Sequence, residues 1–128
     1  MRVLLDTHAF LWWISDDSRL SARVKRIIAD PKSEIMIGYS SLWETAIKIQ
    51  KGTLKVPGNS AAFLIAEMEK NAFRLLPLRI EHLLRLESLK LHHGDPFDRM
   101  LIAQAMEEEV PVLTKDAFFH RYPVKVIW

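Results

Sequence analysis

Short apolar segments alternate with longer segments of helical periodicity along this 128-residue chain. The apolar segments are typical of buried β-strands and occupy residues 2–5, 35–39, 73–77, 110–114 and 124–127. Helical patterns occupy residues 7–14, 22–29, 41–51, 61–70, 80–89 and 96–109, and a single helical turn follows at 117–120. Because strands that alternate with helices are joined by crossover connections, the sequence predicts an α/β fold with a mainly parallel sheet between helices.

Polar residues indicate where several of these helices begin. Ser41 and Glu44 match a capping box that opens the third helix. Asp95 precedes a proline, so it is predicted to cap the sixth helix. Asp116 is predicted to cap the single turn that follows it.

The composition excludes several classes of protein. There is no cysteine, which excludes disulfides, thiolate metal sites and a cysteine nucleophile. No apolar run approaches the roughly 20 residues of a membrane-spanning helix, and Asp6 interrupts the apolar order that a signal peptide requires. We therefore expect a single domain over residues 1–128, in the cytoplasm and without a membrane partner.

The charge distribution leaves two interpretations open. The chain has 18 basic and 16 acidic residues, and its net charge of +2 permits a nucleic-acid partner without indicating one. Basic residues concentrate within residues 19–26 and at Lys48, Lys51 and Lys55. These stretches are either solvated helix faces or a rim that contacts phosphates.

Four acidic residues follow strands of the predicted sheet. Asp6 ends the first strand, and Glu44 lies in the first turn of the helix after the second. Asp98 lies in the first turn of the helix before the fourth strand, and Asp116 follows that strand, which ends at Thr114. Ligands of open α/β sheets bind beyond the carboxyl ends of the strands, so we expect these carboxylates to share one edge. Each also has a structural alternative as a helix cap or a partner of the helix dipole.

A cluster of carboxylates calls for a cation, because unpaired like charges repel. Mg²⁺ and Mn²⁺ prefer oxygen ligands and retain several waters, and such a cation activates water and stabilises charge on a phosphoryl oxygen. Without the cation, at least one carboxylate should keep its proton to a higher pH than a free acid. Glycine occurs only at positions 38, 52, 58 and 94, so no glycine-rich phosphate loop offers a competing site.

Four segments resemble those of a known family: VLLDTHAFLWW at 3–13, SSLWETAIK at 40–48, HHGDPFDRMLIAQA at 92–105 and VLTKDAFF at 112–119. With them, the chain resembles the PIN-domain ribonucleases, and specifically the VapC-type toxins of type II toxin–antitoxin pairs, over essentially its whole length. The resemblance implies a PIN-like three-layer α/β/α sandwich. It also implies an endoribonuclease that hydrolyses RNA phosphodiester bonds with Mg²⁺ or Mn²⁺.

The resemblance further implies roles for particular residues and partners. The family's acidic positions match Asp6, Glu44, Asp98 and Asp116, and its polar residue before the last acid matches Thr114. Asp6 and Asp98 would be the principal metal ligands. Glu44 and Asp116 would complete the site directly or through waters, and Thr114 would position a water or a carboxylate. A homodimer is implied, together with a VapB-type antitoxin that inserts a helix or tail into a groove.

Other residues near these acids are open to catalytic or structural interpretations. His8 is expected to pack in its helix rather than to contact substrate, and the adjacent His92 and His93 lack the spacing of helical metal ligands. Arg99 and Lys115 either bind a phosphate or offset local negative charge. Three aromatic residues are expected in the core or on a dimer face rather than as base-stacking platforms: Trp12, Trp13 and Trp43.

Two alternative functions are less consistent with the pattern. A receiver-like, phosphoryl-accepting domain needs a second acid beside the first-strand aspartate, whereas Thr7 and His8 follow Asp6. A non-catalytic RNA-binding or scaffold domain of the same fold would not need four intact acids. The sequence does not identify the RNA target, because RNA is recognised mainly through loop shape and contacts to unpaired bases.

Overall fold

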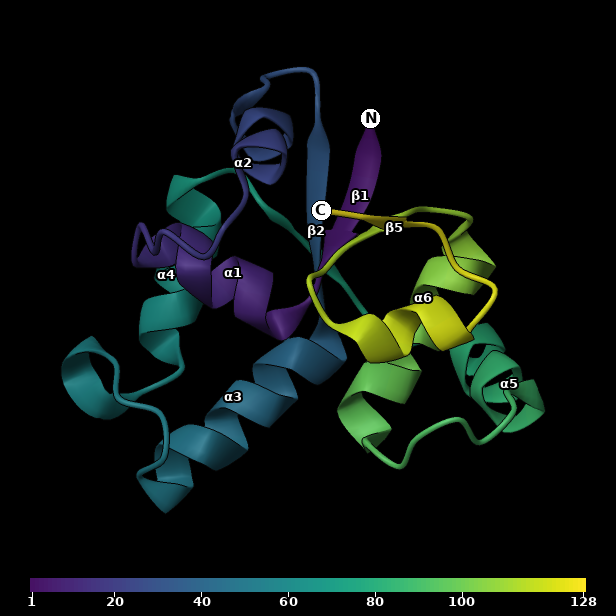
Figure 1. Ribbon diagram of the computed structural model, residues 1–128. Helices are drawn as coiled ribbons and strands as arrows, with labels where there is room; N and C mark the ends of the chain where they lie inside the picture. Colours follow the sequence, from purple (N-terminus) through teal and green to yellow (C-terminus); the bar gives the residue numbers. More distant parts are fainter.

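The computed structural model describes all of residues 1–128 and contains one five-stranded sheet between two layers of helices (Figure 1). The sheet has the order β3-β2-β1-β4-β5, and every pair of neighbouring strands is parallel. Its strands are β1 (Arg2–Leu5), β2 (Glu34–Gly38), β3 (Arg74–Leu76), β4 (Val112–Leu113) and β5 (Val126–Ile127). The predicted α/β/α sandwich with a parallel sheet is therefore confirmed.

Six α-helices and two 3₁₀-helices connect these strands. They are α1 (Thr7–Ile14), α2 (Ala22–Ala29), α3 (Tyr39–Lys51), η1 (Pro57–Asn59), α4 (Ala62–Lys70), α5 (Ile80–Ser88), α6 (Pro96–Glu108) and η2 (Ala117–Arg121). No helix is long and apolar enough to cross a membrane. The last two strands are shorter than predicted, and prolines stand ahead of both, at Pro111 and Pro123. Proline has no N–H to donate to a neighbouring strand, which is consistent with the start of β4 directly after Pro111.

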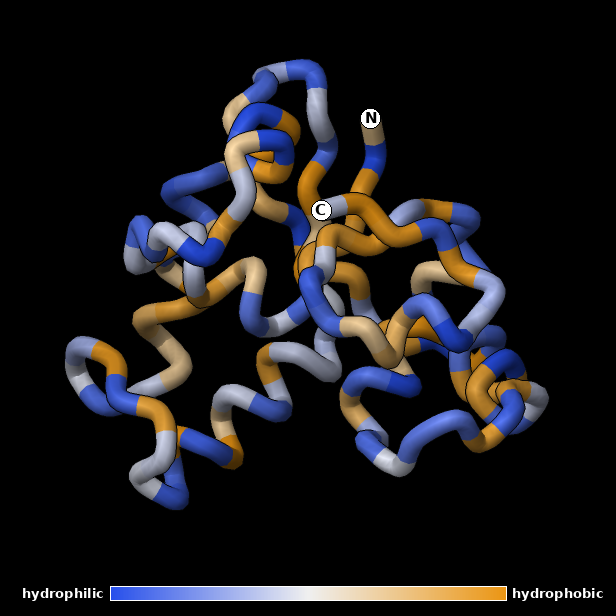
Figure 2. The backbone as a smooth tube through the Cα atoms, in the orientation of Figure 1, coloured by the Kyte–Doolittle hydropathy of each residue, from blue (hydrophilic) through white to orange (hydrophobic).

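Side chains of the strands alternate between two apolar cores. Val3 and Leu5 of β1 face a core that contains residues of α1, α2 and α4. Leu4, between them, faces a second core that contains residues of α6 and η2. Figure 2 shows the strands as mainly hydrophobic segments in the middle of the molecule. The period of two explains why the sheet is covered by helices on both faces.

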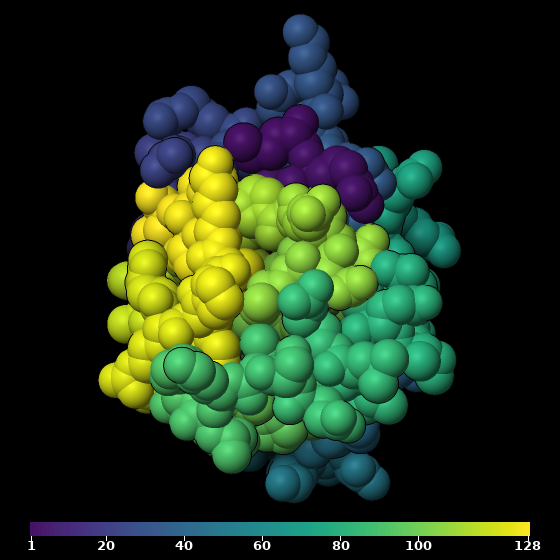
Figure 3. All heavy atoms as spheres, turned by 90° about the vertical axis from the view of Figure 1, so that its right-hand side faces the viewer, coloured from purple at the N-terminus to yellow at the C-terminus, as the bar shows by residue number.

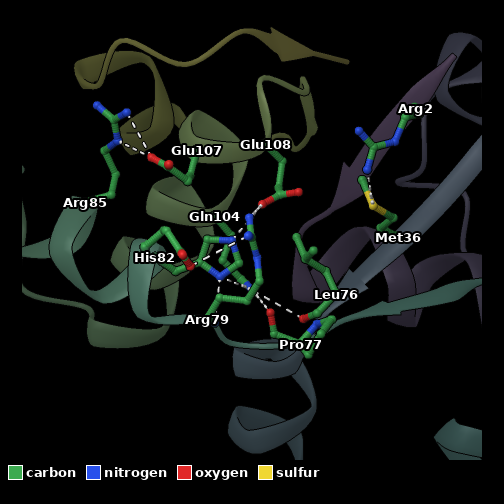
Figure 4. A network of polar contacts seen from close by, with 11 residues as sticks. Arg2, Met36, Leu76, Pro77, Arg79, His82, Arg85, Gln104, Glu107 and Glu108 are labelled. Atoms are coloured by element: carbon green, nitrogen blue, oxygen red, sulfur yellow. Dashed lines mark hydrogen bonds and ion pairs between the residues drawn. The ribbon is translucent and has the colours of Figure 1, made fainter.

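A polar network fastens α5 to α6 within the second layer (Figure 4). The fully buried His82 ring accepts the Arg79 backbone N–H at 3.0 Å and has Glu108 at 2.9 Å from its other nitrogen. Arg79 also forms an ion pair with Glu108. Beside them, the Gln104 amide donates to the Leu76 carbonyl at 3.2 Å and so connects α6 to β3.

Gly38 allows α6 to approach the point where β2 passes into α3. A Cβ atom at this position would lie 2.7 Å from Gln104 Oε1 and 2.8 Å from Leu101 Cδ1. Such contacts are too short, so a larger residue would require the Gln104 and Leu101 side chains to shift. Gly38 is also the N-cap of α3, which begins at Tyr39 rather than at residue 41.

Candidate active site

The predicted acidic residues lie beyond the carboxyl ends of the central strands. Asp6 follows β1 directly, and Asp116 comes shortly after β4, which pairs with β1. Glu44 lies on α3, which begins as β2 ends, and Asp98 lies in the first turn of α6. Figure 1 shows α1 and α3 leaving this lower edge of the sheet.

Asp6 is buried and held by a hydrogen bond on each carboxylate oxygen. Oδ1 accepts the Ala9 backbone N–H at 2.7 Å, which makes Asp6 the cap of α1. Oδ2 accepts the hydroxyl of Thr114. Burial raises the pKa of Asp6, while the hydrogen bonds from Thr114 and Ala9 oppose that shift. The carboxylate is thus fixed in direction, and each oxygen retains a lone pair for a further partner.

Thr114 connects the ends of β1 and β4. Its buried hydroxyl donates to Asp6 and accepts the Asp116 backbone N–H at 3.0 Å. Asp116 Oδ1 accepts the Phe118 N–H at 2.9 Å, so the predicted cap of the following turn is confirmed. The structure therefore brings Asp6, Thr114 and Asp116 together through direct hydrogen bonds.

Glu44 has a different environment from the one predicted. It was expected to complete a capping box with Ser41, but α3 begins two residues before Ser41, so this prediction is wrong. Instead, the buried Thr7 hydroxyl donates to Glu44 Oε1 at 2.8 Å and lies 2.9 Å from Ser41 Oγ. Lys48, one turn further along α3, pairs with Glu44 Oε2 at 2.8 Å. This acid therefore has a cationic partner four residues along the same helix, a spacing typical of helical ion pairs.

Asp98 lies partly buried in the field of four other acids. Burial, as the largest cause, and the negative charges of Asp95, Glu44, Asp116 and Asp6, in that order, together raise its pKa to about 7. Carboxylates must lie close together to influence one another in this way. The direction of this shift agrees with the expectation that one acid of the metal-free site keeps its proton to a higher pH than a free acid.

Asp95 and Asp98 stand three residues apart but have different surroundings. Asp95 Oδ1 accepts the backbone N–H groups of Phe97 and Asp98 at 2.9 and 3.0 Å, so it caps α6 as predicted. The Asp98 carboxylate has no such donor, and its only cationic-type neighbour is His93, with Nε2 3.6 Å from Oδ2. Asp98 is consequently the freer ligand of the two.

An open pocket of about 350 Å³ lies beside Asp6 and Asp116, and it is lined by His8, Trp12 and Lys115 as well. His8 packs against Trp12 one turn along α1, as expected, with ring centroids 5.7 Å apart, and its side chain is exposed at this pocket. Lys115 is exposed there too. Both side chains are available to a ligand that binds next to the buried acids.

Arg99 and His92, two other candidates from the sequence, both contact Tyr122. Arg99 is buried and donates to the Lys90 carbonyl at 2.8 Å and to the Tyr122 hydroxyl at 3.0 Å. These neutral acceptors account for the guanidinium without an acid or a phosphate, so the contacts favour neither of the two interpretations. His92 is exposed, and its ring packs edge-on against Tyr122.

Among the aromatic and basic residues singled out in the sequence, some are packed or paired and others are exposed. Trp12 and Trp13 pack against the first core as expected, whereas Trp43 is 53% exposed and packs edge-on against Phe97. Within the first basic stretch, Arg19 pairs with Asp17 at 2.8 Å and covers one face of Trp12. In the second stretch, Lys51 and Lys55 are exposed.

The donor chemistry of the site fits a hard divalent cation. No three histidine or carboxylate side chains lie close enough together to hold a metal ion by themselves. Mg²⁺ nevertheless keeps several of its waters and is usually bound through only one or two carboxylates. Asp98 meets that requirement because its charge is opposed by neighbouring acids and it lacks a hydrogen-bond donor at bonding distance.

The class that the fold and the site define is an all-parallel α/β/α domain with buried acidic residues at the carboxyl edge of its sheet. Comparison with known families assigns the class more closely. The family model of the PIN domain matches residues 3–125, so the chain belongs to the PIN domain family.

Individual relatives agree with this assignment. The chain is 26% identical to Ribonuclease VapC22 of Mycobacterium tuberculosis over 132 residues, which cover 98% of both chains. Its fold is similar to that of VapBC2 from Rickettsia felis, solved bound to a DNA fragment from their promoter, with a TM-score of 0.77, 14% identity and coverage of 100% and 99%. A toxin–antitoxin complex from Klebsiella pneumoniae gives a TM-score of 0.67 at 15% identity, with 98% and 96% covered. The predicted resemblance to VapC-type proteins is confirmed.

Proposed function

We propose that this chain is a Mg²⁺- or Mn²⁺-dependent endoribonuclease that acts in the cytoplasm as the toxin of a type II toxin–antitoxin pair. The observation that carries the proposal is the electrostatic state of Asp98, whose pKa is raised to about 7 by burial and by four nearby acids. Strongly shifted carboxylates that cluster beside a cleft are typical of functional sites. A cation in the cluster would remove the repulsion.

The ligands follow from the same surroundings. Asp98 and Asp6 would hold the cation, and Glu44 and Asp116 would complete the site directly or through waters. When bound, the cation would lower the pKa of water and offset charge on a phosphoryl oxygen. No three of the acids are close enough together to bind one cation directly. Water molecules would therefore have to supply the remaining ligands.

Side chains behind the acids orient them. Thr114 holds Asp6 Oδ2 and the Asp116 backbone N–H, and Thr7 holds Glu44 Oε1 at 2.8 Å. Such partners fix the direction of ligating carboxylates and are important for metal affinity. His8 and Lys115, exposed beside Asp6, would attract the RNA phosphates.

Apolar surfaces support the proposed protein partners. Three residues of α5 point outward with exposures of 70%, 54% and 60%: Ile80, Leu83 and Leu84. Exposed apolar patches of this kind mark interfaces, which supports a homodimer. A separate groove of about 320 Å³ beside α1 and α4 is lined by Leu11, Leu54, Val56 and Phe63. An apolar groove suits an amphipathic helix, here that of a VapB-type antitoxin.

Cleavage of a structured RNA tests the proposed activity. Ribonuclease-free protein should cleave the RNA with Mg²⁺ or Mn²⁺, and excess EDTA should stop cleavage. Asp98→Asn should lose activity by at least about a hundredfold, since it removes a charged ligand. Asp95→Asn is the matched control in the same helical turn, because asparagine caps a helix as well as aspartate.

Each contrary outcome has a defined meaning. Equal cleavage in EDTA, or an Asp98→Asn variant as active as the wild type, would contradict the metal mechanism. RNA binding without any cleavage would favour the alternative of a non-catalytic RNA-binding or scaffold domain.

A further inference from the structure

His93 has one ring nitrogen without a hydrogen-bond partner, although that nitrogen is buried. Nε2 lies 3.6 Å from Asp98 Oδ2 and makes no hydrogen bond. Buried polar atoms are nearly always paired, so an orphan of this kind needs an explanation. A distance of 3.6 Å is too long for a hydrogen bond, but the nitrogen has the carboxylate as its polar neighbour.

The other side of the ring determines which nitrogen carries the proton. Arg99 can only donate, and its guanidinium donates to the Tyr122 hydroxyl oxygen at 3.0 Å. The Tyr122 proton is therefore free to point at His93 Nδ1, which lies 2.8 Å from the hydroxyl oxygen. The Tyr122 proton has no other acceptor within hydrogen-bond reach, so Nδ1 accepts it and the neutral ring carries its own proton on Nε2, facing Asp98.

Packing holds the ring in this direction. His93 stacks on Phe118 with ring centroids 5.1 Å apart and planes within 8° of parallel. Tyr122, which is 4% exposed, meets the ring on another side at 64°. Figure 3 shows the face on which the segment before α6 lies beside the C-terminal segment that contains these aromatic residues. An imidazole with so few alternative positions can direct a single N–H bond.

We propose that His93 is a positioning residue for Asp98, with its Nε2–H directing the carboxylate toward the acidic cluster. Arg99 and Tyr122 act behind it by fixing the tautomer, so a donor series runs from Arg99 through Tyr122 and His93 to Asp98. The inference rests on the proposed function and extends it to a residue outside the acidic set. A small rotation of the carboxylate would complete the final hydrogen bond.

A purely structural role of His93 would have different consequences. Phenylalanine at this position would keep the stacking on Phe118 and lose both nitrogens. Glutamine would lose the aromatic stacking and restore an N–H donor close to the place of Nε2. Metal affinity should therefore follow the donor, whereas stability should follow the packing.

The test compares three variants with the wild type. Mn²⁺ titration of His93→Phe should show at least about tenfold weaker binding, as for other groups that orient metal ligands. At subsaturating Mn²⁺, its kcat for RNA should fall by a similar factor with KM unchanged. His93→Gln should recover most of the Mn²⁺ affinity, and His120→Phe, at an exposed histidine of η2, should match the wild type. Nitrogen-15 spectra of the metal-free wild type should show the Nε2–H tautomer.

Several outcomes would overturn the inference. These are an Nδ1–H tautomer, wild-type Mn²⁺ affinity in His93→Phe, or equal losses of affinity in His93→Phe and His93→Gln that follow their melting temperatures. A wild-type protein that binds Mn²⁺ but cleaves no RNA would contradict the proposed activity, and the Mn²⁺ comparison would still decide the role of His93. A wild-type protein that neither binds nor cleaves would overturn both.

Discussion

Replacing Asp98 by asparagine should stabilise the metal-free protein, and the gain should grow as the pH rises. The amide has nearly the shape of the carboxyl group but cannot ionise beside the neighbouring acids. An unperturbed aspartate, as in the unfolded chain, has a pKa of 3.8, whereas the pKa of Asp98 in the folded wild type is about 7. The native state therefore binds more protons than the unfolded state between these values, and its stability falls as the pH rises through this window.

The size of the effect follows from the two pKa values. Between about pH 5 and about pH 8, the wild type should lose roughly 2–3 kcal/mol of unfolding free energy relative to Asp98→Asn. The side chain of Asp98 is 23% exposed, so solvent screens its interactions only in part. For a domain of this size, the change corresponds to a difference in melting temperature of roughly 6–10 °C.

Urea unfolding in EDTA at several pH values measures this difference. Glu69→Gln, at an exposed site on α4, serves as the control that should change the unfolding free energy equally at all of them. If the gain of Asp98→Asn were the same at pH 5 and pH 8, Asp98 would not share a site with other carboxylates. The electrostatic basis of the proposed site would then be refuted.

Three further predictions concern the cap of α6, the donor to Asp6 and the exposed lysines. Asp95→Ala should lower the unfolding free energy by about 1 kcal/mol, because a helix cap is lost, yet leave substantial cleavage; an inactive, folded variant would show that Asp95 is the ligand. Thr114→Val should lower stability by about 1–3 kcal/mol in thermal melts by depriving buried Asp6 of a donor, and Thr114→Ser should restore it. Neutralising Lys51 and Lys55 should flatten the salt dependence of RNA binding by about 0.7 in the logarithmic slope for each phosphate contact; an unchanged slope would identify them as solvated surface.

The position of the acidic edge could be predicted because it depends on local sequence. Asp6 and Asp116 follow apolar strands, and Asp95 precedes a proline, so strand ends and helix caps place them. The period-two burial of β1 and the helix boundaries also depend mainly on neighbouring residues. Such short-range patterns are read directly from one chain.

The surroundings of Glu44 could not be predicted in this way. Gly38, the N-cap of α3, leaves room for the Gln104 and Leu101 side chains of α6. That contact joins segments more than 60 residues apart in the sequence. Glu44 and its hydrogen-bond donor Thr7 are also far apart in the sequence, at 37 residues. No local pattern predicts that they pair.

The histidine beside Asp98 was missed for a related reason. His93 and Tyr122 are 29 residues apart, and Arg99 and Tyr122 are 23 apart. Only the fold shows that Arg99 turns away from the acids toward the Lys90 carbonyl. The one available signal was the adjacency of His92 and His93 to the Asp95-Pro96 helix start, which does not indicate which histidine faces the site.

Calorimetric titration of Mn²⁺ into the wild type and Asp98→Asn, near pH 8 and near pH 6, tests the carboxylate metal site most directly. Protons compete with metal for carboxylates, so wild-type affinity should be weaker at the lower pH. Asp98→Asn should bind far more weakly at both values because it lacks a charged ligand. Wild-type affinity that does not change with pH, or equal affinity of the two proteins, would contradict a metal site built on these acids.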